Sequence, residues 1–431
     1  MTSLTAQIRI APGQFSIGNT VSKKSRKSRF SCAVDSALHW LRHEQDWRAV
    51  LGLALVVFVF SGSIHFRRIA YPTDNDYSLH VLYAQQIAEG KFEDVPLNAL
   101  AHPAMQVILI GMHLISFRSL GFYASLIVVQ TAAQVATALI LYFWFGSKEE
   151  SRWNWIRGFW AATLTIVSPI MAFAIVDGLY YFGYIGLANY HNPTIHLLRP
   201  VALLSFILAL RIFRHPRSSG RYVIASAILV IGSGVIKPNY ALVILPALSV
   251  LALWQVYRRK SVDWRLLVLG FFVPGMFVLS SQWIVAFWMA RGEQVSILLR
   301  PFEVETAFSK YLAPKFFLSI VFPLTALLAF FGRLSRDRSV QLGWLALLMG
   351  AAQMYLLAEG GDRFFHGNFR WGAQIGLFLL FAATGREIAR MTIEEARSRK
   401  VRLAVTYGVY VAHVAAGAAY YLRSFASRGY G

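Results

Sequence analysis

The sequence predicts an all-α polytopic membrane protein with about 11 transmembrane helices and one re-entrant or interfacial helix. Hydrophobic residues make up 56% of the 431 residues, whereas a soluble domain has roughly 45 to 50%. The mean hydropathy is +0.49, and the apolar residues gather in runs that short basic segments separate. The net charge of +21 therefore indicates orientation signals and contact with anionic membrane lipids, and we expect no nucleic-acid partner.

The first part of the chain, residues 1–46, is rich in Ser and Lys and has no early apolar run that ends in a small-residue cleavage site. This composition predicts an uncleaved, poorly ordered, basic cytoplasmic tail. We expect residues 47–431 to form a single transmembrane domain. Cys32 is the only cysteine, which excludes an internal disulfide and a cysteine-based zinc site.

The apolar runs were assigned by length, because a helix needs ~20 residues to cross the hydrocarbon core and ~17 are tolerated. The basic segments 211–221, 258–265, 333–338 and 386–402 should lie on the cytoplasmic side. If 103–117 crossed the membrane, the basic segment 147–157 would lie outside, so we expect 103–117 to be the re-entrant or interfacial helix. The predicted spans are 47–66, 120–146, 158–176, 198–213, 222–236, 241–254, 266–290, 316–332, 340–358, 373–385 and 403–422.

This orientation places the polar segments 67–102, 177–197, 237–240, 291–315 and 359–372 on the outer side. In the first segment, apolar residues recur at helical spacing and predict an amphipathic helix on the membrane surface. Asp74 and Asp76 lie at the N-terminal end of this helix. An Asp there either caps the helix or carries chemistry, and both readings stay open.

The second outer cluster lies within residues 189–200, where two His, two Asn and one Arg fall between apolar runs. Each polar group left unsatisfied in lipid costs several kcal/mol, and five such groups exceed what a turn requires. The alternative is a turn at Asn192-Pro193 with an arginine that reaches the lipid head groups. We expect substrate-binding roles for His191, Asn192, His196 and Arg199.

The third outer cluster, residues 359–371, combines charged side chains with aromatic ones. Arginine binds phosphate oxygens bidentately, and aromatic faces suit a sugar ring or a prenyl chain. The alternative is an interfacial aromatic belt with charge pairs. The predicted substrate-binding residues here are Glu359, Asp362, Arg363, His366 and Arg370, and we add Lys237, an outer lysine against the charge bias, and His102.

The order of features in the first outer segment resembles the start of the C-type (GT-C) integral-membrane glycosyltransferases. An acidic residue follows the first span, then comes Tyr77, a helix ending in Ala-x-x-Ile-Ala-x-Gly, and Pro103 at the start of the next apolar helix. Ser168-Pro169 followed by Asp177 is similar to the family's second acidic position. The resemblance covers about residues 47–200. The sequence departs from the family where Tyr77 follows Asp76 in place of a second acidic residue, and where His102 stands in place of Lys or Pro.

The resemblance implies a transferase that moves a sugar from a polyprenyl-phosphate-linked donor to a hydroxyl of a saccharide or lipid-linked acceptor, in one inverting displacement. It implies that Asp76 is the catalytic base or a metal ligand, with Asp74 as the alternate. It also implies that Asp177 is a second acidic residue of the catalytic site. The carboxylate oxygens of Asp76 suit Mg²⁺ or Mn²⁺, although no residue spacing requires a metal. We expect a bacterial inner membrane location with the active site facing outward.

Two other classes of function remain. A transporter or flippase of lipid-linked saccharides would carry ionisable groups near the middle of its spans, whereas the charges here gather at span ends. An envelope polysaccharide polymerase or acyltransferase would share the outer Arg and His clusters, and the sequence leaves it open.

Overall fold

The structure is a computed structural model that describes residues 44–70, 76–146, 151–187, 190, 192–285, 296–394 and 400–426. Most of the predicted cytoplasmic tail, and the candidate residues Asp74 and His191, lie outside the described residues. The chain from Arg48 onward forms one compact unit.

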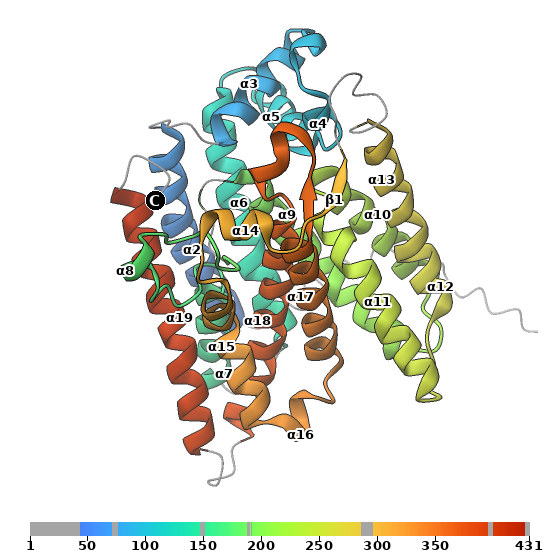
Figure 1. Ribbon diagram of the computed structural model, residues 1–431. Coiled ribbons are helices and arrows are strands. Elements are labelled where there is room, and N and C mark those ends of the chain that lie inside the picture. Colours follow the sequence, from blue (N-terminus) through green and yellow to red (C-terminus); the bar gives the residue numbers. More distant parts are fainter. Residues whose placement is uncertain are drawn as a thin grey trace, which may run out of the picture. The chain divides into compact units, whose positions relative to one another are not determined.

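The described part of the chain is mostly helical, as the sequence predicts, with two short strands and several irregular segments (Figure 1). The elements are α2 (Glu44–Ala70), α3 (Asp76–Ala88), η1 (Phe92–Asp94), α4 (Leu97–Leu100), α5 (Ala104–Ile115), α6 (Phe122–Trp144), α7 (Ser151–Thr163), α8 (Ala174–Asp177), α9 (Pro193–Ala209), η2 (Leu210–Phe213), α10 (Gly220–Ile236), α11 (Asn239–Tyr257), α12 (Trp264–Leu267), the π-helix η3 (Val268–Phe272), α13 (Val273–Trp283), β1 (Ile297–Leu299), α14 (Glu303–Phe308), α15 (Leu312–Ala329), α16 (Phe331–Leu334), α17 (Arg338–Leu356), β2 (Leu357–Glu359), η5 (Gly361–His366), α18 (Arg370–Ile393) and α19 (Lys400–Ala426).

Within the described residues, 8 helical segments are long and apolar enough to cross a membrane, which supports an integral membrane protein. They are α2, α6, α9 with η2, α11, the continuous run from α12 to α13, α15, α17 and α19. Two further apolar helices, α5 and α10, are shorter. Helix α18 has 24 residues and is buried along almost its whole length among the other helices.

The predicted span 158–176 differs in the structure, because helix α7 ends at Thr163 and the chain continues without regular structure to α8. The irregular backbone packs against α19: Ser168 N donates to His413 O at 3.3 Å, and His413 Nδ1 lies 2.7 Å from Ser168 O. A Cβ on Gly417 would lie 2.0 Å from Ile166 O, so only glycine permits this approach. A non-helical segment is tolerated at membrane depth when protein groups satisfy its backbone in this way.

Helices α17 and α18 pack closely enough for their backbones to touch. A Cβ on Gly350 would lie 2.5 Å from Gly372 C, and one on Gly376 would lie 2.7 Å from Ala346 O. Small residues allow this close approach between helices in a membrane. Strand β2 and η5 form the connection between the two helices, so this contact fixes the ends of the third polar cluster.

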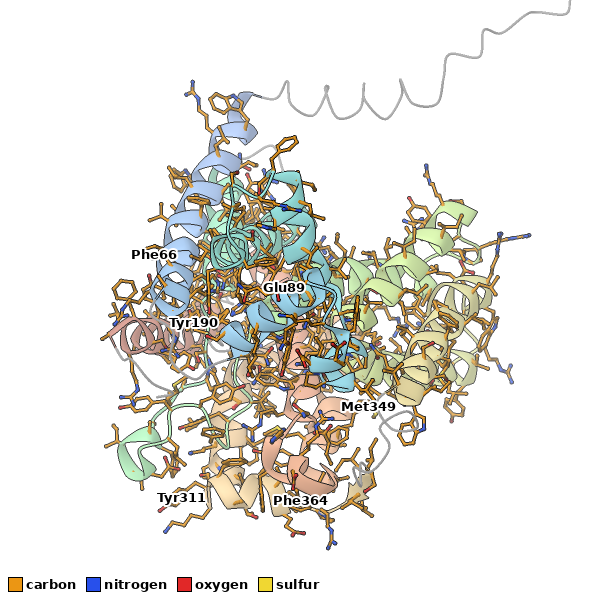
Figure 2. All side chains as sticks on the ribbon, turned by 90° about the horizontal axis from the view of Figure 1, so that it is seen from above. Phe66, Glu89, Tyr190, Tyr311, Met349 and Phe364 are labelled. Atoms are coloured by element: carbon orange, nitrogen blue, oxygen red, sulfur yellow. The ribbon has the colours of Figure 1, made fainter. Side chains whose placement is uncertain are left out.

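Helices α3, α4 and α5 lie together at one end of the described helices (Figure 1). Figure 2 shows this end from above, with Glu89, the residue after α3, toward its centre and Phe364 of η5 at its edge. Helix α3 corresponds to the predicted amphipathic helix and buries Tyr77, Val81 and Ala84. Helix α5 has 12 residues, fewer than a crossing requires, and packs on α3 and α6.

Candidate functional site

Two cavities lie side by side and share the side chains of Asn368 and Trp371. Cavity A has a volume of about 240 Å³, and its polar lining includes His102, Lys237, Glu359 and Arg363. Cavity B has a volume of about 420 Å³, and its polar lining includes Asp76, Asn192, His366 and Arg370. Residues from all three predicted polar clusters therefore line one pair of adjoining cavities.

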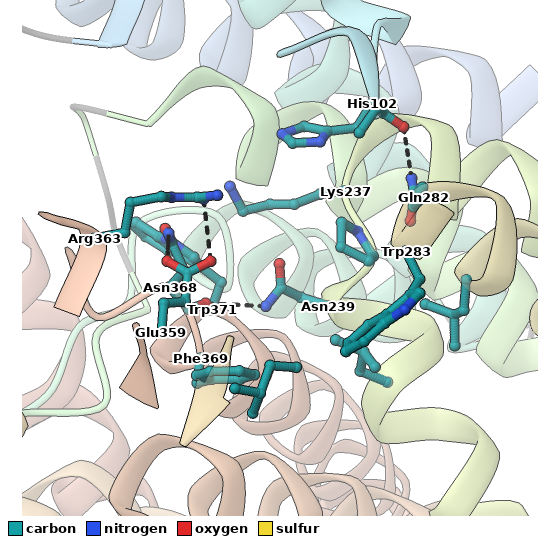
Figure 3. A pocket seen from close by; sticks show the side chains of 15 residues that line it. His102, Lys237, Asn239, Gln282, Trp283, Glu359, Arg363, Asn368, Phe369 and Trp371 are labelled. Carbon is teal, nitrogen blue, oxygen red and sulfur yellow. Dashed lines mark hydrogen bonds and ion pairs between the residues drawn. The ribbon is translucent and has the colours of Figure 1, made fainter. Parts of the chain in front are cut away.

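The polar side of cavity A brings two cations together. Lys237, the residue after helix α10, is 8% exposed. Its Nζ donates to Thr194 Oγ1 at 3.1 Å and lies 5.1 Å from the centre of the Trp371 ring. Figure 3 shows the ends of Lys237 and Arg363 pointing toward each other below the His102 ring. Two like charges that face one gap favour a bound anion.

Glu359 balances part of this charge. Its Oε1 lies 3.1 Å from Arg363 Nη2, and its Oε2 accepts a hydrogen bond from Asn368 Nδ2. Strand β2 ends at Glu359, which pairs with Ile297 of β1 in antiparallel register. The two-stranded sheet thus holds the carboxylate that orients Arg363.

Burial sets the ionisation of the other polar groups in cavity A. Burial lowers the pKa of Lys237 to about 8, although Asp76 and Glu359 oppose this shift. Burial, together with Lys237, His80 and Arg363, lowers the pKa of His102 to about 3. At neutral pH, Lys237 therefore carries a charge in most molecules, while the His102 ring is neutral and still has one N–H to donate.

The opposite side of cavity A is apolar. Leu242 comes from α11, Leu279 and Trp283 from α13, Ile297 from β1, and Phe369 precedes α18. On α13, Phe277 is 66% exposed, as expected of a side chain that faces lipid. A phosphate that carries a long apolar chain would thus fit cavity A, with the phosphate on the polar side and the chain on the apolar side.

Cavity B contains Asp76, the first residue of α3. Asn192 Nδ2 donates to Asp76 Oδ2 at 2.7 Å. The Asn192 Oδ1 atom accepts from Thr194 Oγ1 at 2.7 Å and from Ile195 N at 3.3 Å, so the same side chain caps α9. Because Lys237 donates to Thr194, a continuous chain of hydrogen bonds joins Asp76 in cavity B to Lys237 in cavity A.

Burial raises the pKa of Asp76, while Lys237, the hydrogen bond from Asn192 and His366 act in the opposite direction. A carboxylate with a raised pKa accepts a proton more readily than an exposed one. The surroundings of Asp76 therefore suit a general base.

Arg370 has a partner that the sequence did not reveal. Its Nη2 lies 3.0 Å from Glu305 Oε1, and both side chains are almost fully buried. The guanidinium lies beside the stacked rings of Phe182 and Phe308, 5.1 and 5.0 Å from their centres. Glu305 offers no local signal in the sequence, because its partner is 65 residues away. Asn368 and Trp371, which line both cavities, lie within the third predicted cluster, although neither was among the predicted binding residues.

Several predicted residues lie away from both cavities. Asp177 is held by Lys315 Nζ at 2.5 Å and by Ser309 Oγ at 3.0 Å. Burial opposes ionisation of Asp177, but these two partners and the backbone N–H of Leu179 keep its pKa below the usual value. Asp362 is exposed on η5. An ion-pair role accounts for the position of Asp177, and its predicted catalytic role stays a prediction.

His196 and Arg199 are buried in α9. Gln134 Nε2 lies 3.1 Å from His196 Nδ1 and 3.4 Å from His65 Nε2. The Arg199 guanidinium lies 5.3 Å from the Phe378 ring centre. His65, Gln134 and His196 thus form a polar cluster between α2, α6 and α9. Neither this cluster nor Arg199 belongs to the linings of the two cavities.

The described residues provide little for a metal ion. Among them, no group of three or more His, Cys, Asp or Glu side chains is placed to hold one. Asp76 is the one carboxylate among the described residues that line cavity B, and the charge of Lys237 acts on it electrostatically. Mg²⁺ and Mn²⁺ prefer several oxygen ligands. Because Asp74 lies outside the described residues, the predicted metal role of Asp76 stays a prediction.

The fold and the cavities define the chain as an α-helical membrane protein with a paired polar site at one end. In comparisons with known proteins, no family model matches the chain, and neither a curated protein nor a solved structure matches it.

Proposed function

We propose that the protein is a GT-C-like membrane glycosyltransferase that moves a sugar from a polyprenyl-phosphate-linked donor to an acceptor hydroxyl. One observation carries the proposal. A cation-lined cavity with an apolar wall adjoins a second cavity that contains the carboxylate of Asp76, and the two linings share Asn368 and Trp371. Transfer from a lipid phosphate requires both a phosphate site and a base within reach of one sugar.

In the proposed reaction, the donor phosphate lies between Lys237 and Arg363. The neutral His102 ring donates a hydrogen bond to the phosphate. The prenyl chain lies along Leu242 and Leu279 of cavity A. These cations stabilise the negative charge that develops on the leaving phosphate. In an apolar, partly closed site such stabilisation is stronger than in water.

The acceptor hydroxyl enters cavity B and approaches the anomeric carbon of the sugar. Asp76 takes the hydroxyl proton as the new C–O bond forms. The bond between the anomeric carbon and the phosphate oxygen breaks, and its electron pair leaves with the polyprenyl phosphate. Asn192 holds Asp76 at 2.7 Å and orients it for this step. The displacement inverts the anomeric centre.

The proposed displacement assigns no step to a metal, because Lys237 and Arg363 supply positive charge beside the leaving phosphate. We expect transfer to persist when Mg²⁺ and Mn²⁺ are removed with EDTA. Loss of activity in EDTA that Mg²⁺ or Mn²⁺ restores would show that a metal ligand set exists beyond the described residues.

The proposal includes the topology predicted from the sequence: about eleven crossings, the cavities on the outer side, and a bacterial inner membrane. Helix α16, next to the basic segment 333–338, lies at the end of the helices opposite to α3 (Figure 1). Basic segments gather on the cytoplasmic side, which supports an outward-facing site.

The test uses the purified full-length protein in lipid nanodiscs with synthetic farnesyl-phosphate-linked hexoses and pentoses. We expect release of free farnesyl phosphate from at least one donor, and its loss in Asp76→Asn. The matched control is Asp94→Asn, which changes an exposed carboxylate of η1. The proposal fails if no donor releases farnesyl phosphate, or if Asp76→Asn releases it at the wild-type rate. An acyltransferase would release none.

One observation favours a transporter as the second candidate. The cluster of His65, Gln134 and His196 places polar groups inside membrane-spanning helices, where transporters bind their substrates. A flippase would move a fluorescent lipid-linked saccharide from one leaflet of a vesicle membrane to the other, and Asp76→Asn would not stop this movement. A transferase would form product without moving the lipid.

A further inference from the structure

A third cavity lies between helices α11, α15, α16 and α17 and shares no lining residue with cavities A and B. Its volume is about 370 Å³. We name it the α11–α17 groove and define it by Leu251 and Trp254 of α11, Leu327 of α15, and Trp344 and Leu345 of α17. The lining is almost wholly apolar, so the groove suits a hydrocarbon chain.

Aromatic residues at the end of α11 place the groove at the edge of the membrane. Trp254 and Tyr257 stack with ring centres 5.6 Å apart, and they are 47% and 77% exposed. Exposed Trp and Tyr gather at the level of the lipid head groups. A lipid whose chain fills the groove would therefore have its head group beside Trp254.

Two arginines without a carboxylate partner lie at this level. Arg258 follows α11 and lies 5.7 Å from the centre of the Trp254 ring. Arg338, the first residue of α17, donates to Gln341 Oε1 at 2.5 Å and to Gln255 Oε1 at 3.0 Å. Arg258 is close enough to act electrostatically on Arg338.

The nearby carboxylates already have other partners. Asp337 Oδ1 accepts from the backbone N–H groups of Ser339 and Val340 and so caps α17. Arg333, in contrast to Arg338, is paired with Glu394 at 2.6 Å. In the described part of the chain, neither Arg258 nor Arg338 has a carboxylate within 4.0 Å.

Two buried hydrogen-bond donors also lack an acceptor among the described residues. Trp344 Nε1 and Gln255 Nε2 are buried, and nothing among the described residues accepts a hydrogen bond from them. Buried N–H groups without a partner carry a free-energy cost that an added acceptor would remove. The phosphate and ester oxygens of a phospholipid are acceptors only.

We propose that the α11–α17 groove binds one anionic glycerophospholipid, with an acyl chain against Leu251 and Leu345 and the phosphate beside Arg258 and Arg338. The occupant is a phospholipid and not free phosphate, because the apolar groove continues directly from the cationic rim. The site is independent of the function proposed for cavities A and B. It would attach the cytoplasmic end of the helices to anionic lipid.

The test measures binding of phosphatidylglycerol to the full-length protein in detergent by native mass spectrometry, with phosphatidylcholine as the neutral lipid. We expect retained phosphatidylglycerol to exceed phosphatidylcholine. In the double variant Arg258→Gln/Arg338→Gln, affinity for phosphatidylglycerol should fall by about thirtyfold, from the loss of two charges at an anionic lipid. Arg217→Gln, which removes an exposed charge from another basic segment, should leave binding unchanged.

Two further measurements separate the head group from the chain. Inorganic phosphate at millimolar concentration should not displace the lipid, whereas Leu251→Trp, which fills the groove, should reduce retention. The proposal is overturned by equal retention of both lipids, by a double variant that binds like Arg217→Gln, or by displacement with phosphate alone. Melting temperatures without added lipid check that each variant is folded.

Discussion

Replacing Lys237 with methionine removes the ammonium group and keeps an unbranched side chain that fits the same space. Lys237 is 8% exposed, and its Nζ faces cavity A beside Arg363. A hydrogen bond between a charged donor and a phosphate contributes ~1.5 to 3 kcal/mol. We therefore expect the affinity for farnesyl phosphate to fall about 10- to 150-fold. Binding of farnesol, which lacks the phosphate, should not change.

The same variant should change the pH dependence of transfer. Because the pKa of Lys237 is about 8, kcat/KM for the wild-type protein should fall as the pH rises through 8 and the ammonium loses its proton. A bound phosphate favours the charged form, so the fall in kcat should lie at higher pH. Lys237→Met should abolish this alkaline fall. It should also move the acid limb to higher pH, since Lys237 lowers the pKa of Asp76.

The assay is displacement of a fluorescent prenyl phosphate from protein in nanodiscs by farnesyl phosphate and by farnesol, together with initial rates across pH 4 to 10. Lys310→Met is the matched control, because Lys310 is exposed and lines neither cavity. If Lys237→Met binds farnesyl phosphate as tightly as Lys310→Met does, or keeps the alkaline fall near pH 8, Lys237 does not bind the phosphate.

Three further predictions concern the base and the packing. Asp76→Asn should lower transfer by about 100-fold or more and leave farnesyl phosphate binding intact; weakened binding would indicate a structural role. Glu305→Gln leaves the buried Arg370 unpaired and should cost ~3 to 5 kcal/mol in thermal unfolding, whereas Glu303→Gln, at a side chain that is 53% exposed, should cost little. Gly350→Ala places a Cβ 2.5 Å from Gly372 C and should cost ~1 to 3 kcal/mol. Gly332→Ala meets nothing within 4 Å, and an equal loss there would refute the packing argument.

The sequence predicted the class of fold and most of the polar residues that line the cavities. His102, Lys237, Arg363 and His366 stand at the ends of apolar runs, where charge is costly unless it faces water or a ligand. The basic segments predicted which helix ends lie on the same side of the membrane. This reasoning uses only local composition, and it predicted that residues more than 200 positions apart in the sequence lie on one side.

The parts that could not be predicted depend on contacts between distant segments. The Arg370–Glu305 pair turns one candidate binding residue into part of a buried ion pair, and Lys315 does the same for Asp177. Helix α7 ends at Thr163, earlier than its hydropathy indicates, because His413 of α19 satisfies the backbone beyond it. Helix α18 continues past 385, the predicted end of the span, and Glu387 in this extension pairs with Arg333 of another helix. Periodicity in one segment carries no information about such partners.

The backbone contact between α17 and α18 has a consequence for the membrane itself. Gly350 and Gly376 leave no space for one helix to slide along the other, so Arg363 keeps one position relative to both helices. In the proposed reaction, a lipid phosphate would have to reach Arg363 at that position. Bilayers that are thinner or thicker than the native membrane would present the phosphate too low or too high, and helices adapt to such mismatch only by tilting or by deforming the bilayer. The acyl-chain length of the surrounding lipid would then control the rate of transfer, even though that lipid never enters the site.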